Sequence, residues 1–148
     1  MGWVEDLHGK TVGLDTAPLI FYIEDHPAYA NLLDPFFEAV KAGEIRVVTS
    51  ILTLLEVLVH PLKHGDENLA HEYNDVLLSS PYIFTIPVTP ATAQAAAELR
   101  AASSLKTPDA IHLATAINHH ADAFLTNDRD FGDIQGLEVL KVRELASM

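Results

Sequence analysis

Short apolar segments alternate along this chain with longer segments in which apolar residues recur at helical spacing. The short segments have the length and composition of strands and lie at residues 12–15, 46–49, 82–86, 123–126 and 137–142. The helical segments lie at residues 16–24, 29–42, 51–60, 66–78, 90–102 and 107–120. Strands that alternate with helices predict an α/β fold: a three-layer α/β/α sandwich around a parallel, mostly five-stranded sheet.

Several residues predict where the helices begin and end. Gly43 is placed to stop the second helix, and Pro61 to stop the third. Thr107, Pro108 and Asp109 form a strong start for the last long helix. The chain has 148 residues, of which 49% are hydrophobic, so we expect one folded domain spanning residues 1–148 with a sizeable core.

Four acidic residues stand at the edges of these apolar segments. Asp15 ends the first strand, and Glu56 lies within the helix after the second strand. Asp109 is in the first turn of its helix, and Asp128 follows the fourth strand. Because ligands of an open parallel sheet bind beyond the carboxyl ends of its strands, we expect all four to gather at one end.

Such a cluster needs a positively charged partner. Two like charges about 4 Å apart repel by ~4 kcal/mol at an effective dielectric constant near 20. The chain has 9 Lys and Arg against 21 Asp and Glu, so a divalent cation is a better partner than basic side chains. Oxygen ligands suit Mg²⁺ or Mn²⁺, which activate water and neutralise charge in phosphodiester hydrolysis. The absence of cysteine excludes thiolate ligands and a cysteine nucleophile.

Each acid alone has a simpler interpretation. Asp15 and Asp128 can cap a helix or a turn, and Asp109 can stabilise a helix through its dipole. Glu56 can be a solvated residue of an amphipathic helix. The four acids in this order are more specific than any one of them, and they predict a metal-dependent hydrolase.

The overall charge and the N-terminal sequence limit where the protein works. A net charge of −12 argues against a nonspecific coat on nucleic acid and favours a basic protein partner. Residues 1–10 have no features of a signal peptide. The longest apolar run, residues 51–59, is too short to cross a bilayer. We therefore expect a cytoplasmic protein without membrane contact.

Four segments that contain these acids resemble the PIN-domain family, and more narrowly its VapC-like toxin ribonucleases. They are LDTAPLIFYIE, TSILTLLEVLV, KTPDAIHLATA and LTNDRDF. The resemblance implies that Asp15, Glu56, Asp109 and Asp128 bind Mg²⁺ or Mn²⁺ and cleave an RNA substrate. It also implies a homodimer and a cognate antitoxin that blocks the site. The alternative is a non-catalytic module of the same fold that sequesters a basic protein or RNA partner.

Residues near the acids are candidates for supporting contacts. Thr126 matches the small polar residue that precedes the last acid, and either orients a ligand or water or binds backbone at the strand end. Asn127 and Asp130 are close enough in sequence to contact groups that hold the metal. His112 lies one helical turn from Asp109, where it faces either the site or the core.

Basic and metal-binding residues elsewhere provide weaker signals. His60 and His64 have the spacing of a zinc pair, but histidines at a helix C-terminus explain them better. Arg129 directly follows Asp128 and is a candidate phosphate contact. Lys106 and Arg100 are better explained as surface charges.

Overall fold

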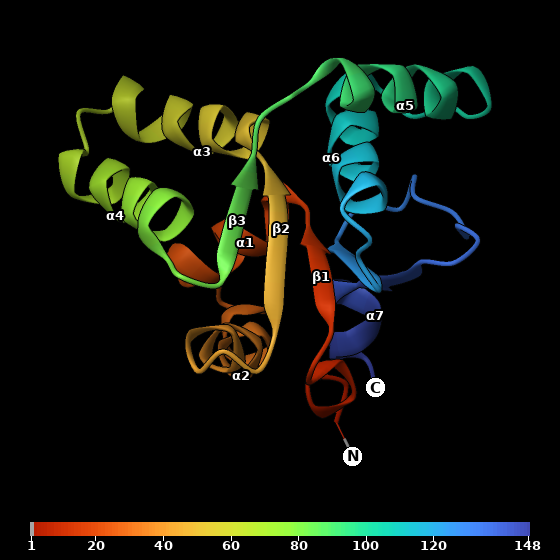
Figure 1. Ribbon diagram of the computed structural model, residues 1–148. Coiled ribbons are helices and arrows are strands. Elements are labelled where there is room, and N and C mark those ends of the chain that lie inside the picture. Colours follow the sequence, from red (N-terminus) through yellow and green to blue (C-terminus); the bar gives the residue numbers. More distant parts are fainter. Residues whose placement is uncertain (1) are drawn as a thin grey trace.

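The computed structural model describes residues 2–148 (Figure 1), and they form the predicted three-layer α/β/α sandwich. Its central sheet has five strands in the order β3-β2-β1-β4-β5, all parallel to their neighbours. The strands are β1 (Thr11–Leu14), β2 (Arg46–Ser50), β3 (Ile83–Ile86), β4 (Ala123–Thr126) and β5 (Glu138–Lys141). All five lie within one or two residues of the predicted segments.

Helices cover both faces of this sheet. They are α1 (Thr16–Ile23), α2 (Ala30–Lys41), α3 (Ile51–Lys63), α4 (Glu67–Ser79), α5 (Pro90–Ala101), α6 (Thr107–Asn118) and α7 (Val142–Ala146), preceded by a short 3₁₀ helix, η1 (Glu5–Leu7). Helices α1 to α4 and α7 pack over one core, and α5 and α6 over the other. Successive residues of β2 point to opposite faces, so Val47 belongs to the first core and Val48 to the second. None of the helices in residues 2–148 is long and apolar enough to span a membrane.

One predicted helix boundary was wrong, and one helix was missed. Pro61 does not end the third helix, because α3 continues to Lys63 with the proline ring buried. Proline removes one N–H donor, and near the end of a helix this costs a single backbone hydrogen bond. The short α7 was not predicted at all. Five residues are too few to form a stable helix by propensity, and α7 is held by the burial of Val142 and Leu145.

Glycine permits a close contact that positions the helix carrying Asp109. A Cβ atom at Gly13 in β1 would lie 2.5 Å from the Cβ atom of Ala116. No real side chain tolerates that distance, so glycine is what lets α6 lie directly against β1. The first turn of α6, with Asp109, is thereby fixed beside the end of β1.

Candidate functional site

The strand order places a switch point between β1 and β4. From β1 the chain moves outward to β2 and β3, and then returns to β4 on the other side of β1. Leu14 pairs with Leu125, and the N–H of Asp15 donates to the carbonyl oxygen of Leu125 at 3.0 Å. Asp15 therefore emerges beside Thr126, at the carboxyl edge where ligands of such sheets bind.

All four predicted acids line one hollow at this edge, with a volume of about 330 Å³. The other lining residues are Thr16, Ala17, Ile20, His112 and Asn127. The structure thus brings together residues from α1, α3, α6 and the loop after β4. Within residues 2–148, however, no three Asp, Glu or His side chains are arranged so that they could together hold one metal ion. The four acids therefore line the same hollow, but their carboxylates do not converge on a single position.

Asp15 is held in a fixed orientation at the floor of the hollow. The residue is only 6% exposed. One of its carboxylate oxygens accepts a hydrogen bond from the Thr126 hydroxyl at 2.6 Å, and the other accepts from the Thr16 N–H at 2.9 Å. Asp15 is therefore both the N-cap of α1 and a lining residue of the hollow. Burial raises the pKa of Asp15, while the hydrogen bond from Thr126 opposes the rise.

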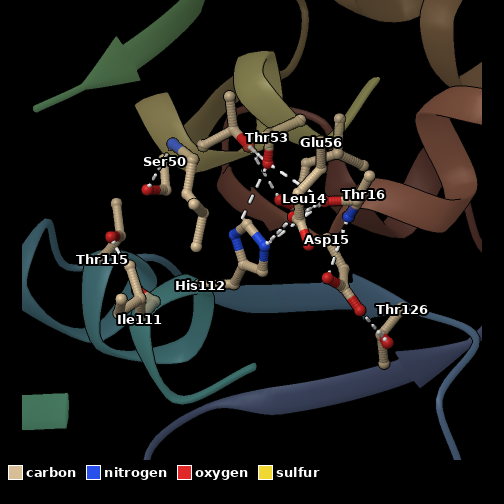
Figure 2. Close-up of polar contacts among 12 residues, drawn as sticks. Leu14, Asp15, Thr16, Ser50, Thr53, Glu56, Ile111, His112, Thr115 and Thr126 are labelled. Atoms are coloured by element: carbon tan, nitrogen blue, oxygen red, sulfur yellow. Dashed lines mark hydrogen bonds and ion pairs between the residues drawn. The ribbon is translucent and has the colours of Figure 1, made fainter. Parts of the chain in front are cut away.

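Glu56 is oriented by His112 and Thr16 (Figure 2). Its Oε1 accepts from the Thr16 hydroxyl at 2.8 Å and lies 2.7 Å from His112 Nε2. Partial burial alone would raise the pKa of Glu56, but hydrogen bonds from His112 and Thr16 outweigh it and lower the pKa. Because a carboxylate can only accept, Nε2 of His112 carries a proton. His112 is thus buried at the edge of the core and is also bonded to an acid that lines the hollow.

Three threonine hydroxyls extend this network beneath the hollow. Thr49 donates to the carbonyl oxygen of Leu14 at 3.0 Å and lies 3.1 Å from the Thr53 hydroxyl. Thr53 in turn lies 3.3 Å from the Thr16 hydroxyl and 3.5 Å from His112 Nδ1. Sequence reasoning missed Thr16, Thr49 and Thr53 as parts of the site, because a threonine beside a strand or helix end is too common to stand out.

Asp109 and Asp128 complete the acidic lining. Burial, followed by the charges of Asp15 and Asp128, raises the pKa of Asp109 to about 6. The N–H of Asp128 donates to the Thr126 hydroxyl at 3.0 Å, and its Oδ1 accepts from the N–H of Asp130 at 2.8 Å. The Thr126 hydroxyl thus binds both the Asp15 carboxylate and the backbone just after its own strand, and Asp130 contributes its main-chain N–H.

The weaker candidates lie outside the lining of the hollow. The rings of His60 and His64 lie at the C-terminal end of α3 with their centroids 4.2 Å apart and their planes tilted by 38°. Arg129 and Lys106 are exposed and do not line the hollow. Arg100 donates to the carbonyl oxygen of Leu105 and to the Thr107 hydroxyl, so it braces the turn that leads into α6.

Comparisons with known proteins agree with this arrangement. A family model described as the PIN domain matches residues 12–137. Three similar solved structures are VapBC2 from Rickettsia felis bound to a promoter DNA fragment, a toxin–antitoxin complex from Klebsiella pneumoniae, and VapBC-5 from Mycobacterium tuberculosis.

Their sequence identities are 20%, 25% and 20%, and their TM-scores are 0.66, 0.59 and 0.58, in the same order. The aligned regions cover 88%, 86% and 89% of this chain and 98%, 94% and 98% of the respective chains. A search of curated proteins found no match.

Proposed function

Because the chain belongs to the PIN domain family, we propose that it is a metal-dependent endoribonuclease, and the toxin of a type II toxin–antitoxin pair. The observation that carries this proposal is the hollow at the β1–β4 switch point, which is lined by four acids. Neither Lys nor Arg is among the described residues that line it. Such an acidic hollow favours a cation, and through the cation a phosphodiester substrate.

The residues present fit Mg²⁺ or Mn²⁺. The side chains available to the ion are the carboxylates of Asp15, Glu56, Asp109 and Asp128, all oxygen donors. Mg²⁺ keeps several of its water ligands and is commonly bound through only one or two carboxylates. A hollow in which the carboxylates do not fully surround the ion is therefore compatible with Mg²⁺. A bound ion would neutralise charge on the scissile phosphate and lower the pKa of water.

The chain's own contribution is to hold these carboxylates in place before the substrate arrives. Thr126 and the N–H of Thr16 fix both oxygens of Asp15, and His112 and the Thr16 hydroxyl fix Oε1 of Glu56. Groups that are oriented in advance need not reorganise during the reaction, which lowers its barrier. No serine, cysteine or histidine nucleophile is required.

A cognate antitoxin is the partner that this proposal implies. The similar structure from Klebsiella pneumoniae is a toxin–antitoxin complex, and 25% of the aligned residues are identical. For the present chain we propose that an antitoxin covers the acidic hollow and blocks access of RNA. The net charge of −12 favours a basic binding segment in that partner.

A second copy of the chain is the other partner that we propose. Helix α3 exposes an apolar row, in which Leu55 is 60% and Leu62 is 67% exposed, together with Ile51 and Val59. The acid of α3, Glu56, lines the hollow instead. Helix α3 carries no other acid, and burial of its apolar row against a second copy would favour a homodimer.

The test is cleavage of a mixture of structured and single-stranded RNAs with Mn²⁺, with Mg²⁺ or with EDTA. We expect discrete fragments that require the metal and disappear in Asp15→Asn. Asp34→Asn is the matched control, because Asp34 is an exposed acid of α2 that does not line the hollow. Equal cleavage by the wild type and by Asp15→Asn would rule out the proposed site.

The net charge of −12 favours one other function. In that alternative, the protein is a non-catalytic PIN-fold module that sequesters a basic protein or RNA partner. Tight binding to the product of an adjacent gene, together with metal binding but no cleavage of any RNA, would support the module. Metal-dependent cleavage would exclude it.

A further inference from the structure

Arg143 binds Asn127 through three hydrogen bonds, although 16 positions separate the two residues. The backbone N–H of Arg143 donates to Oδ1 of Asn127 at 3.0 Å, and its Nε donates to the same oxygen at 3.2 Å. Its Nη2 donates to the backbone carbonyl oxygen of Asn127 at 2.9 Å. Both the side chain and the main chain of Asn127 are therefore held by one residue.

The register of the sheet brings these two residues together. Thr126 at the end of β4 pairs with Lys141 at the end of β5. The chain leaves both strands at the same edge, so the loop that begins at Asn127 lies beside the start of α7. Arg143 is the second residue of α7, and both Arg143 and Asn127 are half-buried. Partial burial limits the competition of water for these hydrogen bonds.

The held residue lies directly before one of the four acids. Asn127 and Asp128 both line the hollow. The backbone N–H of Asp128 donates to the Thr126 hydroxyl, and this hydroxyl donates in turn to the Asp15 carboxylate. The backbone that leads into Asp128 is thus held by Arg143 from α7 and by Thr126 from β4.

We propose that Arg143 is a positioning residue for Asp128, a role that rests on the proposed function of the hollow. By fixing Asn127, it holds the loop in the conformation in which the Asp128 carboxylate lines the hollow. Removal of groups that orient metal ligands typically weakens metal binding by about 10- to 100-fold. Arg143 would therefore determine cation affinity without touching the cation.

Two simpler explanations predict different behaviour. In the first, Arg143 acts only through its positive charge near the acids. Both variants keep the backbone N–H bond to Asn127. Arg143→Lys also keeps the charge but lacks the planar group that reaches two acceptors, whereas Arg143→Met keeps only the aliphatic stem of the side chain. In the second, Arg143 merely anchors α7. Leu145→Ala tests this, because Leu145 is a buried residue of α7 that makes none of the three bonds.

The experiment measures two quantities in the full chain of the wild type and the three variants. The first is the dissociation constant for Mn²⁺, from the electron paramagnetic resonance signal of the free ion. The second is hydrogen exchange at the Asp128 amide by NMR in metal-free protein. We expect Arg143→Met and Arg143→Lys to weaken Mn²⁺ binding by about 10-fold or more and to accelerate exchange. Leu145→Ala should leave both quantities unchanged, although thermal unfolding, recorded as a control, should show a lower melting temperature.

The proposal is overturned if Arg143→Met keeps the wild-type exchange rate or affinity for Mn²⁺. It is also overturned if Arg143→Lys restores the affinity, or if Leu145→Ala weakens it equally. If the wild type binds no Mn²⁺, the proposed metal site is wrong, and Arg143 then has no metal ligand to position. Exchange at Asp128, which is measured without metal, would still report whether Arg143 holds the loop.

Discussion

His112 and Glu56 join helices from opposite faces of the sheet. His112 Nε2 on α6 lies 2.7 Å from Glu56 Oε1 on α3, above the carboxyl edge of the strands. The histidine side chain is 1% exposed and the glutamate side chain is 32% exposed. This pair therefore fixes one wall of the acidic hollow relative to the other, and it orients a carboxylate that would otherwise rotate freely.

Replacing His112 should test this link. His112→Leu removes the donor to Glu56, and we expect the free energy of unfolding to fall by about 1–3 kcal/mol, as for a lost hydrogen bond to a charged group. His112→Gln places an amide donor near the position of Nε2 and should recover part of the loss. Urea denaturation in EDTA measures both variants. Equal stabilities for the two variants would mean that packing, and not the hydrogen bond, sets the effect.

Thr126 binds two acids with one hydroxyl, so its removal should disturb both. Thr126→Val keeps the shape of the side chain but loses the bonds to the Asp15 carboxylate and to the Asp128 N–H. We expect the affinity for Mn²⁺ to fall by about 10- to 100-fold, as for other residues that orient metal ligands. Thr126→Ser keeps the hydroxyl and should bind nearly as well as the wild type. Calorimetric titration compares the three proteins, and unchanged binding by Thr126→Val would contradict the expectation.

The raised pKa of Asp109 predicts how stability depends on pH in the metal-free protein. The folded-state pKa of about 6 lies above the ordinary value of 3.8, so the folded state binds more protons than the unfolded state between these values. The contribution of Asp109 to stability is therefore fully present below about pH 4 and is lost as the pH rises through 6.

Asp109→Asn should consequently stabilise the metal-free protein at pH 7.5 by about 1 kcal/mol, since solvent screens a partly exposed carboxyl. At pH 4 the variant and the wild type should be nearly equal. Thermal unfolding in EDTA at the two pH values provides the comparison. A variant that is less stable than the wild type at pH 7.5 would show that Asp109 is not under electrostatic strain.

Added Mn²⁺ should stabilise the folded wild type by binding in the acidic hollow. A ligand present at about 100 times its dissociation constant stabilises the folded state by ~2.7 kcal/mol. The melting temperature of the wild type and of Asp34→Asn should rise accordingly, and that of Asp15→Asn much less. A full rise in Asp15→Asn would place the ion elsewhere on this acidic chain.

The apolar row on α3 predicts the assembly state. Leu55→Arg puts a charge at its centre, and we expect the homodimer to dissociate to monomers without loss of the fold, because Leu55 is 60% exposed. Leu78→Arg on α4, at a residue that is 58% exposed, should leave the dimer intact. Sedimentation velocity measures the masses. A wild type that is monomeric at all concentrations would exclude the dimer.

The sequence alone was sufficient for the layered α/β fold. Apolar strands of four or five residues between amphipathic helices have few stable arrangements other than a parallel sheet covered on both faces. The order of the four acids relative to these elements was also enough to predict that they meet, because the carboxyl ends of parallel strands share one edge. Gly43 ended α2 as predicted, with a positive φ of 78°.

Only the tertiary structure decided which groups hold the acids in place. Thr16, Thr53 and His112 come from three different helices, and their hydroxyl and imidazole groups meet only after the helices have packed. Arg143 reaches Asn127 because β4 and β5 end in register, which no local pattern encodes. Hydrophobic periodicity determines layers and elements within short windows, whereas hydrogen bonds between distant side chains depend on relative positions that packing alone establishes.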